Sequence, residues 1–391
     1  MGRYIVMDVV FYGNSLNYDQ GSGNYQELKK ITKWDGRQYS LVSRYSLRYS
    51  LLETAKQSGL WSTAEASKLQ RAGDAEKTVI QPAIETLLTG EILEYPEFDL
   101  FGYLITNTTP SNPRTAPVKI SHAVSLTPFQ YDSHLSGNLG LARRMVSKTG
   151  KMDPNLFTME EHQTYYIYNV VVDLDRIGKN EVYLSKKDGN NWEVGIKDNS
   201  DSEYTIDIKK ADKNAKGTYE VNKEKKIGEK SELRVEKSEL DDVYILSQEI
   251  EDDDFVNERL KQLVSFVMGL KRSIKGREED LSPKLMVVGV YKNKPYKTYK
   301  DKINLVDEYV QEEYDEIEES EEDGKKIYKV RHKTSQSRKP IFEVEGTNVI
   351  PQQINENEIN ELLNKLFDNN QELEELKVFK DTSVQVRVQN Q

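Results

Sequence analysis

The chain has 391 residues with a formal net charge of −11, and 36% of them are hydrophobic and 31% charged. It contains no cysteine, which excludes disulfides, zinc ribbons and a thiol nucleophile, and no run approaches the roughly 18 apolar residues of a membrane-spanning helix. The length suits one large domain or two to three smaller ones. Because no small-residue cleavage site follows the short apolar run at the N-terminus, we expect a cytoplasmic protein that makes no membrane contact.

The charge is unevenly distributed along the chain. Between Asp301 and Asp323 there are twelve acidic residues and one lysine, so the rest of the chain is neutral overall. We expect this acidic run to form a solvated loop or helix face. Between Lys29 and Lys56 there are seven basic residues and two acidic ones, a local excess that attracts phosphate groups whatever the total charge.

The N-terminal part predicts one strand, one loop and one helix. The apolar, β-branched run Tyr4–Tyr12 predicts a buried strand, and a Gly- and Asn-rich loop follows it. Asp35 is a candidate N-cap with Gln38 three residues later, and Gly59 is a candidate stop, so we predict one long helix between them. Residues 61–93 predict a small helical insertion.

The middle of the chain is richer in strand signals. A strand is predicted at "FDLFGYLIT", and the irregular stretch "NTTPSNPRTAPVKISHAVSLTPF" after it predicts a long functional loop or hairpin. Residues 164–178, "TYYIYNVVVDLDRIG", give the strongest strand signal because Tyr, Ile and Val dominate them. Residues 185–242 mix short alternating runs with many charges, which predicts a β-rich surface insertion or partial disorder.

An amphipathic helix and a strand follow. The segment "DFVNERLKQLVSFVMGLKRSIKG" predicts a helix that ends at Gly276, and "PKLMVVGVYKN" predicts a strand. A short apolar piece, "PIFEVEG", and a weak helix around "ENEINELLNKLF" lie in the C-terminal part. The apolar face of the amphipathic helix consists of Val256, Leu260, Leu263, Val267 and Ile274.

The clear elements run in the order β, α, β, β, α, β, with insertions between them. This order predicts an α+β fold with a ferredoxin-like or RNA-recognition-type palm, βαββαβ. In such a palm the two helices cover one face of the sheet, and we expect the other face to be free.

Enzyme motifs are mostly absent from the sequence. It contains no Walker loop, no Gly-rich dinucleotide turn, no HExxH and no GxSxG. The four histidines are scattered without ligand spacing, so we expect no metal site and no cofactor. Asp173 and Asp175 would share a face in a strand and could reach one Mg²⁺, but the neighbouring Arg176 favours solvated or ion-paired carboxylates.

The predicted helix after Asp35 carries three arginines in one stripe. At 100° per residue, Arg37, Arg44 and Arg48 fall within a narrow sector. Such a stripe beside a helix N-terminus and a basic loop favours a run of phosphates over carboxylate partners or simple exposure to water. In this helical projection the adjacent apolar face consists of Leu41, Val42, Tyr45, Tyr49 and Leu52, and a separate small face consists of Ser43, Ser46 and Ser50.

Three segments together resemble a known family. "ELKKITKWDGRQYSLVSRYSLRYSLLE", "FDLFGYLIT…RTAPVKISHAVSLTPF" and "YYIYNVVVDLDRIG" resemble the DevR-type backbone subunit of type I-B CRISPR surveillance (Cascade) complexes, in CRISPR-associated family seven. The resemblance covers roughly the first 180 residues in order. It implies a palm with finger and thumb insertions, and no nuclease activity.

The resemblance also implies partners. Copies of such a subunit polymerise along CRISPR RNA, bind its phosphates and displace a base at intervals, so that spacer segments remain free to pair with target DNA. Other Cascade subunits cap the RNA ends or act as large and small subunits. The implied division is a first βα unit at 1–60, the insertion at 61–93, a strand with a long loop or thumb-like region at 94–163, a palm strand at 164–184, a polar β-rich insertion at 185–250, a palm helix and strand at 251–292, and an acidic C-terminal extension at 293–391.

The resemblance assigns RNA-binding roles to specific positions. They are a loop with Asn17, Lys29 and Lys30, a helix segment with Ser43, Arg44 and Arg48, a signature stretch with Arg114, Lys119 and His122, and a possible thumb segment with Arg143, Arg144 and Met145. Arg37 joins them on helical geometry alone. Met145 would act as an apolar wedge between bases, or else belong to the core.

Three functions therefore stay open from the sequence. The first is a non-enzymatic guide-RNA filament subunit, and the second is a relative that cuts RNA with Mg²⁺ and an acidic loop residue such as Asp19. The third is a transcriptional or developmental regulator. The sequence favours the first, because its matched residues suit phosphates and its acidic residues lack identifiable metal partners.

Overall fold

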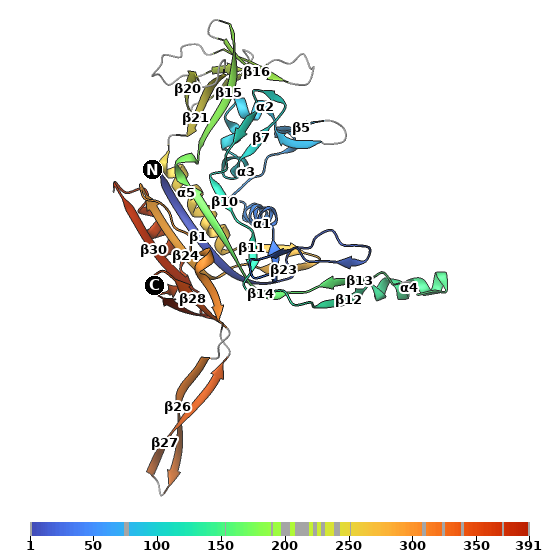
Figure 1. Cartoon of the computed structure of the whole chain (residues 1–391), viewed down its shortest axis with the longest axis vertical. Coiled ribbons are helices and arrows are strands. Elements are labelled where there is room, and N and C mark those ends of the chain that lie inside the picture. Colours follow the sequence, from blue (N-terminus) through green and yellow to red (C-terminus); the bar gives the residue numbers. More distant parts are fainter. Residues whose placement is uncertain are drawn as a thin grey trace.

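The computed structural model has one large β-sheet in the middle of the molecule (Figure 1). Nine strands form it in the order β29-β30-β24-β1-β14-β11-β4-β3, with β10 also paired to β14. The structure describes residues 2–73, 78–152, 154–188, 191–196, 204–207, 219–221, 225–227, 231–237, 243–250, 252–306, 310–322, 325–337, 340–369 and 371–389. The sheet strands are β1 Arg3–Asn14, β3 Lys30–Thr32, β4 Gln38–Val42, β10 Val118–Ile120, β11 Ala123–Ser125, β14 Gln163–Asp173, β24 Pro283–Lys292, β29 Gln352–Gln353 and β30 Leu373–Lys380.

Strands β24, β1 and β14 form the centre of this sheet and confirm three strand predictions. Their β-branched and aromatic residues fit a pleated, buried surface. Val6 of β1 lies opposite Val171 of β14 on one side and Gly289 of β24 on the other, and both pairings are antiparallel. Residues 5–11 of β1 are all buried, so both faces of this strand are covered.

Three helices share the core on one face of the sheet: α1 (Arg44–Gln57), α5 (Asp253–Met268) and α6 (Glu356–Asn364). Helix α5 was expected from its apolar periodicity, and α6 as a weak helix around "ENEINELLNKLF". Helix α5 ends at its C-cap Gly269, earlier than predicted. Ile274 therefore lies in β22 (Lys271–Ile274), which pairs with β23 (Arg277–Asp280), and Gly276 occupies the turn between them with a φ of 78°.

The opposite face of the sheet is partly covered, so the predicted free face is wrong there. A three-stranded sheet in the order β25-β28-β31 shares a second core with Val10, Ile167 and Val287 of the central strands. Phe342 of β28 is fully buried in that core. The apolar "PIFEVEG" segment thus covers part of this face. The three strands of the small sheet are β25 Ile303–Val306, β28 Ile341–Glu345 and β31 Gln385–Gln389.

Helix α1 starts nine residues after the predicted N-cap. Asp35 lies in the turn of a hairpin formed by β3 and β4, where its Oδ1 accepts a hydrogen bond from the backbone N–H of Arg37. Ser43 is the actual N-cap, and its hydroxyl accepts from the backbone N–H of Ser46. The predicted end is confirmed, because Gly59 follows the last turn with a φ of 75°.

Two further predictions need correction. Residues 61–93 contain the hairpin of β5 (Leu69–Ala72) and β6 (Val79–Pro82) between short helices, rather than a helical insertion. The segment predicted as a long functional loop or hairpin contributes β10 and β11 to the central sheet, where each pairs with β14 and where Val118 and Ala123 are buried. The short helices are η1 Ala66–Lys68, α2 Ile84–Leu88, η2 Glu91–Leu93 and α3 Pro96–Asp99.

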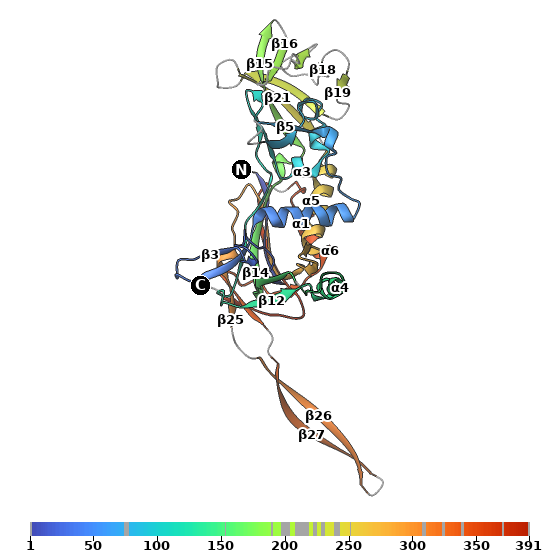
Figure 2. The same cartoon turned by 90° about the vertical axis from the view of Figure 1, so that its right-hand side faces the viewer.

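Three structures extend from the central body (Figures 1 and 2). An arm consists of the hairpin β12 (Ser133–Gly137) and β13 (Leu156–Glu160) with α4 (Leu139–Thr149) at its end. A ribbon consists of β26 (Val310–Glu322) and β27 (Lys325–Ser337), which pair with each other. The acidic run expected as a loop or helix face is thus mostly strand β26.

The third extension is the β-rich insertion, as predicted. Eight strands form its sheet in the order β19-β18-β17-β16-β15-β21-β20, with β8 paired to β16. Within the described part of the chain, no helix combines the length and apolar character of a membrane span. The remaining elements are β2 Tyr25–Gln26, β7 Tyr103–Ile105, β8 Thr108–Thr109, β9 Asn112–Arg114, η3 Leu174–Arg176, β15 Lys179–Asp188, β16 Asn191–Ile196, β17 Tyr204–Asp207, β18 Tyr219–Val221, β19 Lys225–Ile227, β20 Ser231–Lys237, β21 Val243–Ile250 and η4 Lys300–Lys302.

Candidate nucleic-acid interface

The N-terminus of α1 is fixed by a small polar network. The Asn17 side-chain oxygen accepts from the backbone N–H of Ser43 at 2.9 Å and from the Ser46 hydroxyl at 3.2 Å. Asn17 is 9% exposed, and Ser43 caps the helix. Both predicted RNA-binding residues therefore hold the helix in place, and the adjoining Arg44 is left exposed.

Four residues with basic side chains meet at this helix end, and we call them the Arg44 cluster: Lys29, Arg44, His122 and Lys300. The backbone N–H of Arg44 donates to Nδ1 of His122 at 3.0 Å. Lys300 Nζ donates to the Ser121 hydroxyl at 3.0 Å and to the His122 carbonyl at 3.2 Å. Segments that are far apart in the sequence thus place three cationic side chains around the imidazole of His122.

The electrostatics of the Arg44 cluster favour an anionic partner. Burial lowers the pKa of His122, and the positive charges of Arg44, Lys300 and Lys29 lower it further. Burial likewise lowers the pKa of Lys300. Lys29 Nζ lies 3.5 Å from an Asp19 carboxylate oxygen in a pair exposed to solvent. A phosphate placed here would relieve the mutual repulsion of the cations.

Exposed aromatic residues flank the cluster. Tyr45 and Tyr49 are 65% and 63% exposed, so the prediction that they form the buried face of the helix is wrong. The buried residues of α1 are instead Leu47, Ser50, Leu51 and Ala55. The Arg44 guanidinium lies 5.0 Å from the Tyr45 ring centre and donates to its hydroxyl at 3.0 Å, which lowers the pKa of Tyr45. Such rings offer faces on which bases can stack.

Arg48 lies on the same helix, and its side chain has a structural role. Its guanidinium lies 5.0 Å from the Phe101 ring centre and donates to the Glu97 carbonyl at 3.3 Å. Its burial lowers the pKa of the guanidinium. Replacing Arg48 would therefore disturb packing as well as charge.

Three other predicted residues are engaged in ion pairs. Arg37 lies on the β3–β4 turn, outside the helix, and its Nε donates to Asp35 at 2.8 Å, so the three-arginine stripe does not exist. Lys30 Nζ donates to both oxygens of Glu160, at 2.8 and 2.6 Å, in a pair that is mostly buried. Arg114 is buried against Asp99 at 2.7 Å. These contacts give Lys30 and Arg114 structural roles.

The remaining predicted residues lie at separate places. Lys119 is exposed on β10, whereas Arg143, Arg144 and Met145 are exposed on α4 at the end of the arm. Met145 is 48% exposed, which rules out the alternative that it belongs to the core. The structure thus brings Arg44, His122 and Lys29 together and places the α4 residues elsewhere.

The acidic residues considered for metal binding are paired or isolated. Asp173 lies 3.3 Å from Arg176, and Asp175 lies 2.7 Å from Arg3, as the ion-pair alternative predicts. Among the residues that the structure describes, no group of three or more His, Asp or Glu side chains is placed to hold a metal ion.

Sequence reasoning missed Lys300. It is the last residue of a lysine-rich segment, "YKNKPYKTYK", whose positive charge is masked by the acidic run after it. The bond from Lys300 to the His122 carbonyl spans 178 residues, a pairing that no local pattern encodes. The lysine spacing in that segment was the one available signal.

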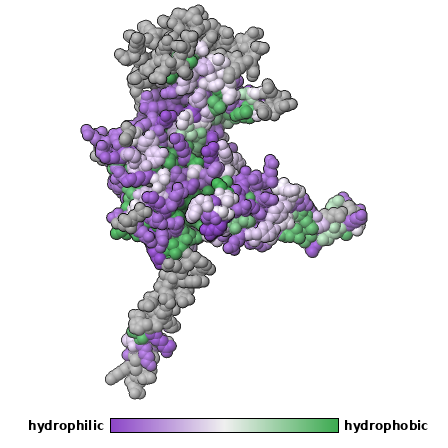
Figure 3. All heavy atoms as spheres, viewed as in Figure 1, coloured by the Kyte–Doolittle hydropathy of each residue, from purple (hydrophilic) through white to green (hydrophobic). Residues whose placement is uncertain are grey.

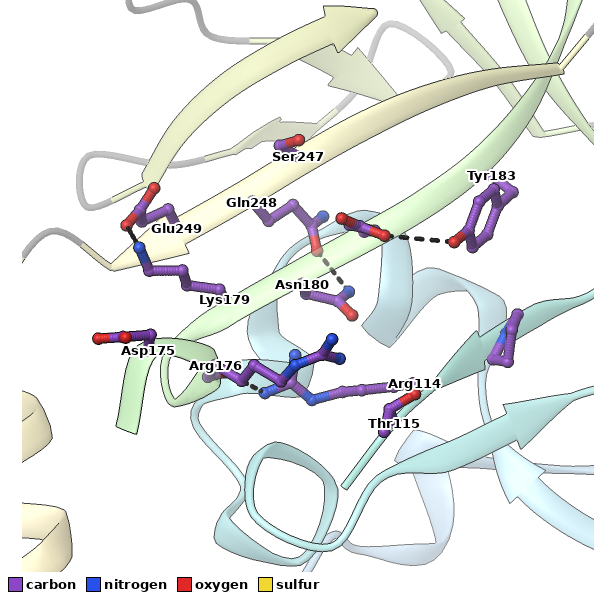
Figure 4. Close-up of a pocket in the computed structure, with 12 residues that line it drawn as sticks. Arg114, Thr115, Asp175, Arg176, Lys179, Asn180, Tyr183, Ser247, Gln248 and Glu249 are labelled. Carbon is purple, nitrogen blue, oxygen red and sulfur yellow. Dashed lines mark hydrogen bonds and ion pairs between the residues drawn. The ribbon is translucent and has the colours of Figure 1, made fainter. Parts of the chain in front are cut away.

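A separate cavity of about 510 Å³ lies at the base of the β-rich insertion (Figure 4). Arg114, Arg176 and Lys179 line it together with Asp175, Glu181 and Glu249. Lys179 pairs with Glu249, and the Tyr183 hydroxyl donates to Glu181. Because its charges largely compensate each other, this cavity lacks the cationic excess of the Arg44 cluster.

The fold and the cluster define a mixed α+β protein with a basic, aromatic-flanked surface at one helix end. The chain belongs to the family described as "CRISPR-associated negative auto-regulator DevR/Csa2", whose model matches residues 5–314. The resemblance predicted from the sequence is thereby confirmed at the level of the family.

Solved structures with a similar trace are described as CRISPR complexes. A chain of a "CRISPR RNA-guided surveillance complex, pre-nicking" matches with a TM-score of 0.40 and 9% identity, covering 75% of this chain and 80% of that one. A chain of a "CRISPR RNA-guided surveillance complex" gives 0.34 and 9%, covering 75% and 72%. A chain of a "Type IV-B CRISPR Complex" gives 0.27 and 12%, covering 44% and 73%. No curated protein matches the chain.

Proposed function

We propose that this protein is a backbone subunit of a type I-B Cascade complex. In this proposal several copies polymerise along one CRISPR RNA, bind its phosphates without reading its sequence, and present spacer segments for pairing with target DNA. Other Cascade subunits complete the assembly in the cytoplasm. The protein itself cuts no nucleic acid and uses no cofactor.

The observation that carries the proposal is the Arg44 cluster. Arg44, Lys29 and Lys300 come from three separate segments, and each lies close enough to His122 for its charge to lower the pKa of the imidazole. Phosphate binding needs such a concentration of charge and needs no base recognition. Exposed Tyr45 and Tyr49 on the next turns of the same helix add surfaces for stacking.

The strand order supports a ferredoxin-like palm as part of the proposal. Strands β24, β1, β14 and β11 are neighbours in antiparallel pairs, α1 lies between β1 and β11 in sequence, and α5 lies between β14 and β24. This is the connectivity of a split βαβ fold. The arm and the β-rich insertion are then the candidates for the thumb and finger.

The proposal is tested by removing two exposed cations. We expect Arg44→Ala with Lys29→Ala to weaken binding of a single-stranded RNA roughly tenfold at moderate salt and to lower the salt slope by about 1.4, since each lost phosphate contact changes that slope by about 0.7. Fluorescence anisotropy of a labelled RNA over a range of salt concentrations measures both quantities.

The matched control is Lys56→Ala, which removes an exposed cation from the last turn of the same helix. It should leave the affinity and the salt slope nearly unchanged. If the double variant kept wild-type affinity and slope, the Arg44 cluster would not be the RNA site.

A second candidate function comes from the description of the family as a negative auto-regulator. Tight, sequence-specific binding to duplex DNA from the control region of its own gene, with weak binding to single-stranded RNA, would favour this candidate. Metal-dependent RNA cutting is tested separately: cleavage with Mg²⁺ that Asp19→Ala abolishes would replace the non-enzymatic proposal.

A further inference from the structure

Strands β22 and β23 form a short hairpin beside α1, and Arg272 of β22 reaches that helix. Its Nη1 donates to the Ser46 carbonyl at 3.2 Å and to the Ser50 hydroxyl at 2.9 Å. Its Nε donates to the Leu16 carbonyl at 2.8 Å, in the loop that follows β1. One guanidinium group therefore joins the hairpin to two segments that lie more than 200 residues before it in the sequence.

Both contacts of Arg272 lie next to the network that fixes the N-terminus of α1. Leu16 directly precedes Asn17, whose side-chain oxygen accepts from the Ser46 hydroxyl at 3.2 Å. Ser46 therefore contacts Asn17 through its hydroxyl and Arg272 through its carbonyl. Arg44 lies on the same first turn of the helix, so the direction of its side chain depends on this network.

The surroundings of Arg272 suit a residue that holds segments together. Its three hydrogen bonds end on two carbonyls and one hydroxyl, which are neutral acceptors at fixed positions. The side chain is half-buried, burial lowers the pKa of the guanidinium, and Ser50 is fully packed into the body. Because an arginine presents its donors in a rigid planar fork, bonds to both segments also fix the distance between them.

The same hairpin carries a second arginine that provides an internal comparison. Nη2 of Arg277 donates to the Asn14 carbonyl at 3.5 Å, and its Nη1 lies 3.6 Å from Glu161. Arg277 is also half-buried, but its partners lie at the end of β1 and at the base of the arm. Hydrophilic residues gather where the arm leaves the body (Figure 3). The two arginines of one hairpin thus contact different elements.

We propose that Arg272 is a positioning residue for the Arg44 cluster. It fixes the chain at Leu16 against the first turns of α1, and so holds Arg44 in place beside His122 without contacting RNA itself. Without Arg272, the carbonyls of Leu16 and Ser46 lose their shared donor, and the N-terminus of α1 moves more freely. Phosphate binding then requires more ordering of the site, which weakens it. The inference rests on the proposed function, because it assigns Arg272 to the same RNA site.

The test compares two substitutions of Arg272 in the full-length protein. Arg272→Met keeps an unbranched side chain but removes every donor, and we expect it to weaken binding of a labelled oligouridine roughly five- to tenfold. The slope of affinity against salt should stay at the wild-type value, because no phosphate contact is lost. Arg272→Lys should restore affinity to within about threefold of wild type, since an ammonium can still donate to both carbonyls.

The matched control is Arg277→Met, which removes a half-buried arginine from the same hairpin. It should leave RNA affinity nearly unchanged even if calorimetry shows a similar fall in melting temperature. Equal losses of RNA affinity in the two variants would overturn the inference, because Arg272 would then act through stability alone. A fall of about 0.7 in the salt slope of Arg272→Met would overturn it as well, since that is the value of a lost phosphate contact. Should Arg272→Met not fold, Ser50→Ala removes one of the three acceptors and gives the same readouts with smaller changes.

Hydrogen exchange without RNA separates this inference from the proposed function. Arg272→Met should speed amide exchange in residues 43–50, measured by mass spectrometry, and Arg277→Met should not. Wild-type exchange there in Arg272→Met would overturn the positioning role and leave the proposed function standing. Faster exchange in a protein whose wild type binds no oligouridine would support the contact of Arg272 with α1 and overturn the proposed function.

Discussion

Asp8 is a fully buried carboxylate in the centre of β1 that helps to position the Arg44 cluster. One of its oxygens accepts from the Asn169 side chain and the other from the backbone N–H of Tyr299, both at 2.7 Å. The second bond fixes the chain immediately before Lys300, which reaches the Ser121–His122 segment. Burial raises the pKa of Asp8 to about 6, although these hydrogen bonds and the charge of Lys300 favour the ionised form.

The raised pKa of Asp8 makes part of the folding stability decrease with rising pH. Between about pH 4 and pH 6 the folded state retains a proton that the unfolded state has released, so the free energy of unfolding falls over this window. Asp8→Asn removes the titration. We expect the variant to gain on the order of 2–3 kcal/mol relative to wild type between about pH 4 and pH 7, measured by urea unfolding.

Asp381→Asn provides a control of opposite sign. Hydrogen bonds from Ser383 lower the pKa of Asp381, so its contribution to stability is lost as the pH falls. A stability difference between wild type and Asp8→Asn that stayed constant with pH would contradict the argument for Asp8.

At the scale of elements, one buried carboxylate joins helix α5 to strand β9 and to the start of the β-rich insertion. Asp99 of α3 accepts from Arg114 of β9 and from Arg259 of α5, each at 2.7 Å, and from the backbone N–H of Gly178 at 2.9 Å. Asp99 is 0% exposed and the two guanidinium groups are nearly buried. Asp99 therefore supplies the counter-charge for two buried guanidinium groups.

Removing that charge should be costly for stability. Asp99→Asn keeps the shape but leaves two buried arginines without a counter-charge, and we expect a loss of about 3 kcal/mol in the free energy of unfolding. Asp175→Asn, which breaks the more exposed pair with Arg3, is the control and should cost less than about 1 kcal/mol. Similar losses in both variants, measured by urea unfolding, would show that Asp99 has no special role.

The sequence predicted those elements whose patterns are long. The continuous apolar runs of β1, β14 and β24 and the long periodicity of α5 leave little ambiguity. The segment Gln38–Val42 has only five residues, over which strand and helix periods cannot be told apart, and Asp35 suits a turn as well as a helix cap. That ambiguity led to the incorrect position of Arg37 and the incorrect apolar face of α1.

The same reasoning applies to the candidate site. Arg44 and Lys29 were predicted from local charge and His122 from the family resemblance, but their convergence with Lys300 depends on contacts between distant segments. Lys30 pairs with the buried Glu160, which lies far from it in the sequence. Arg114 pairs with the buried Asp99, which lies in a different element. Charge alone could not separate the cations that pair internally from those that remain available.

At the scale of the whole molecule, the ribbon is peripheral to the folded body. Among the described residues, β26 and β27 have each other as their only strand partners. Replacing residues 310–337 with a short flexible linker should leave the melting temperature of the body unchanged. Calorimetry checks this expectation, and a large fall in melting temperature would contradict this separation.

The pairing of β26 with β27 also fixes which face of the ribbon each residue occupies. Residues of opposite parity point to opposite faces, and the strands extend about 40 Å from end to end. Deleting Lys329 would shift Val330 to the position opposite Glu318, so that Val330 would leave the face that it shares with Ile317. A single deletion would thus leave the composition almost the same and still remove a shared face of the ribbon. Selection therefore acts on the spacing of this segment as much as on its residues.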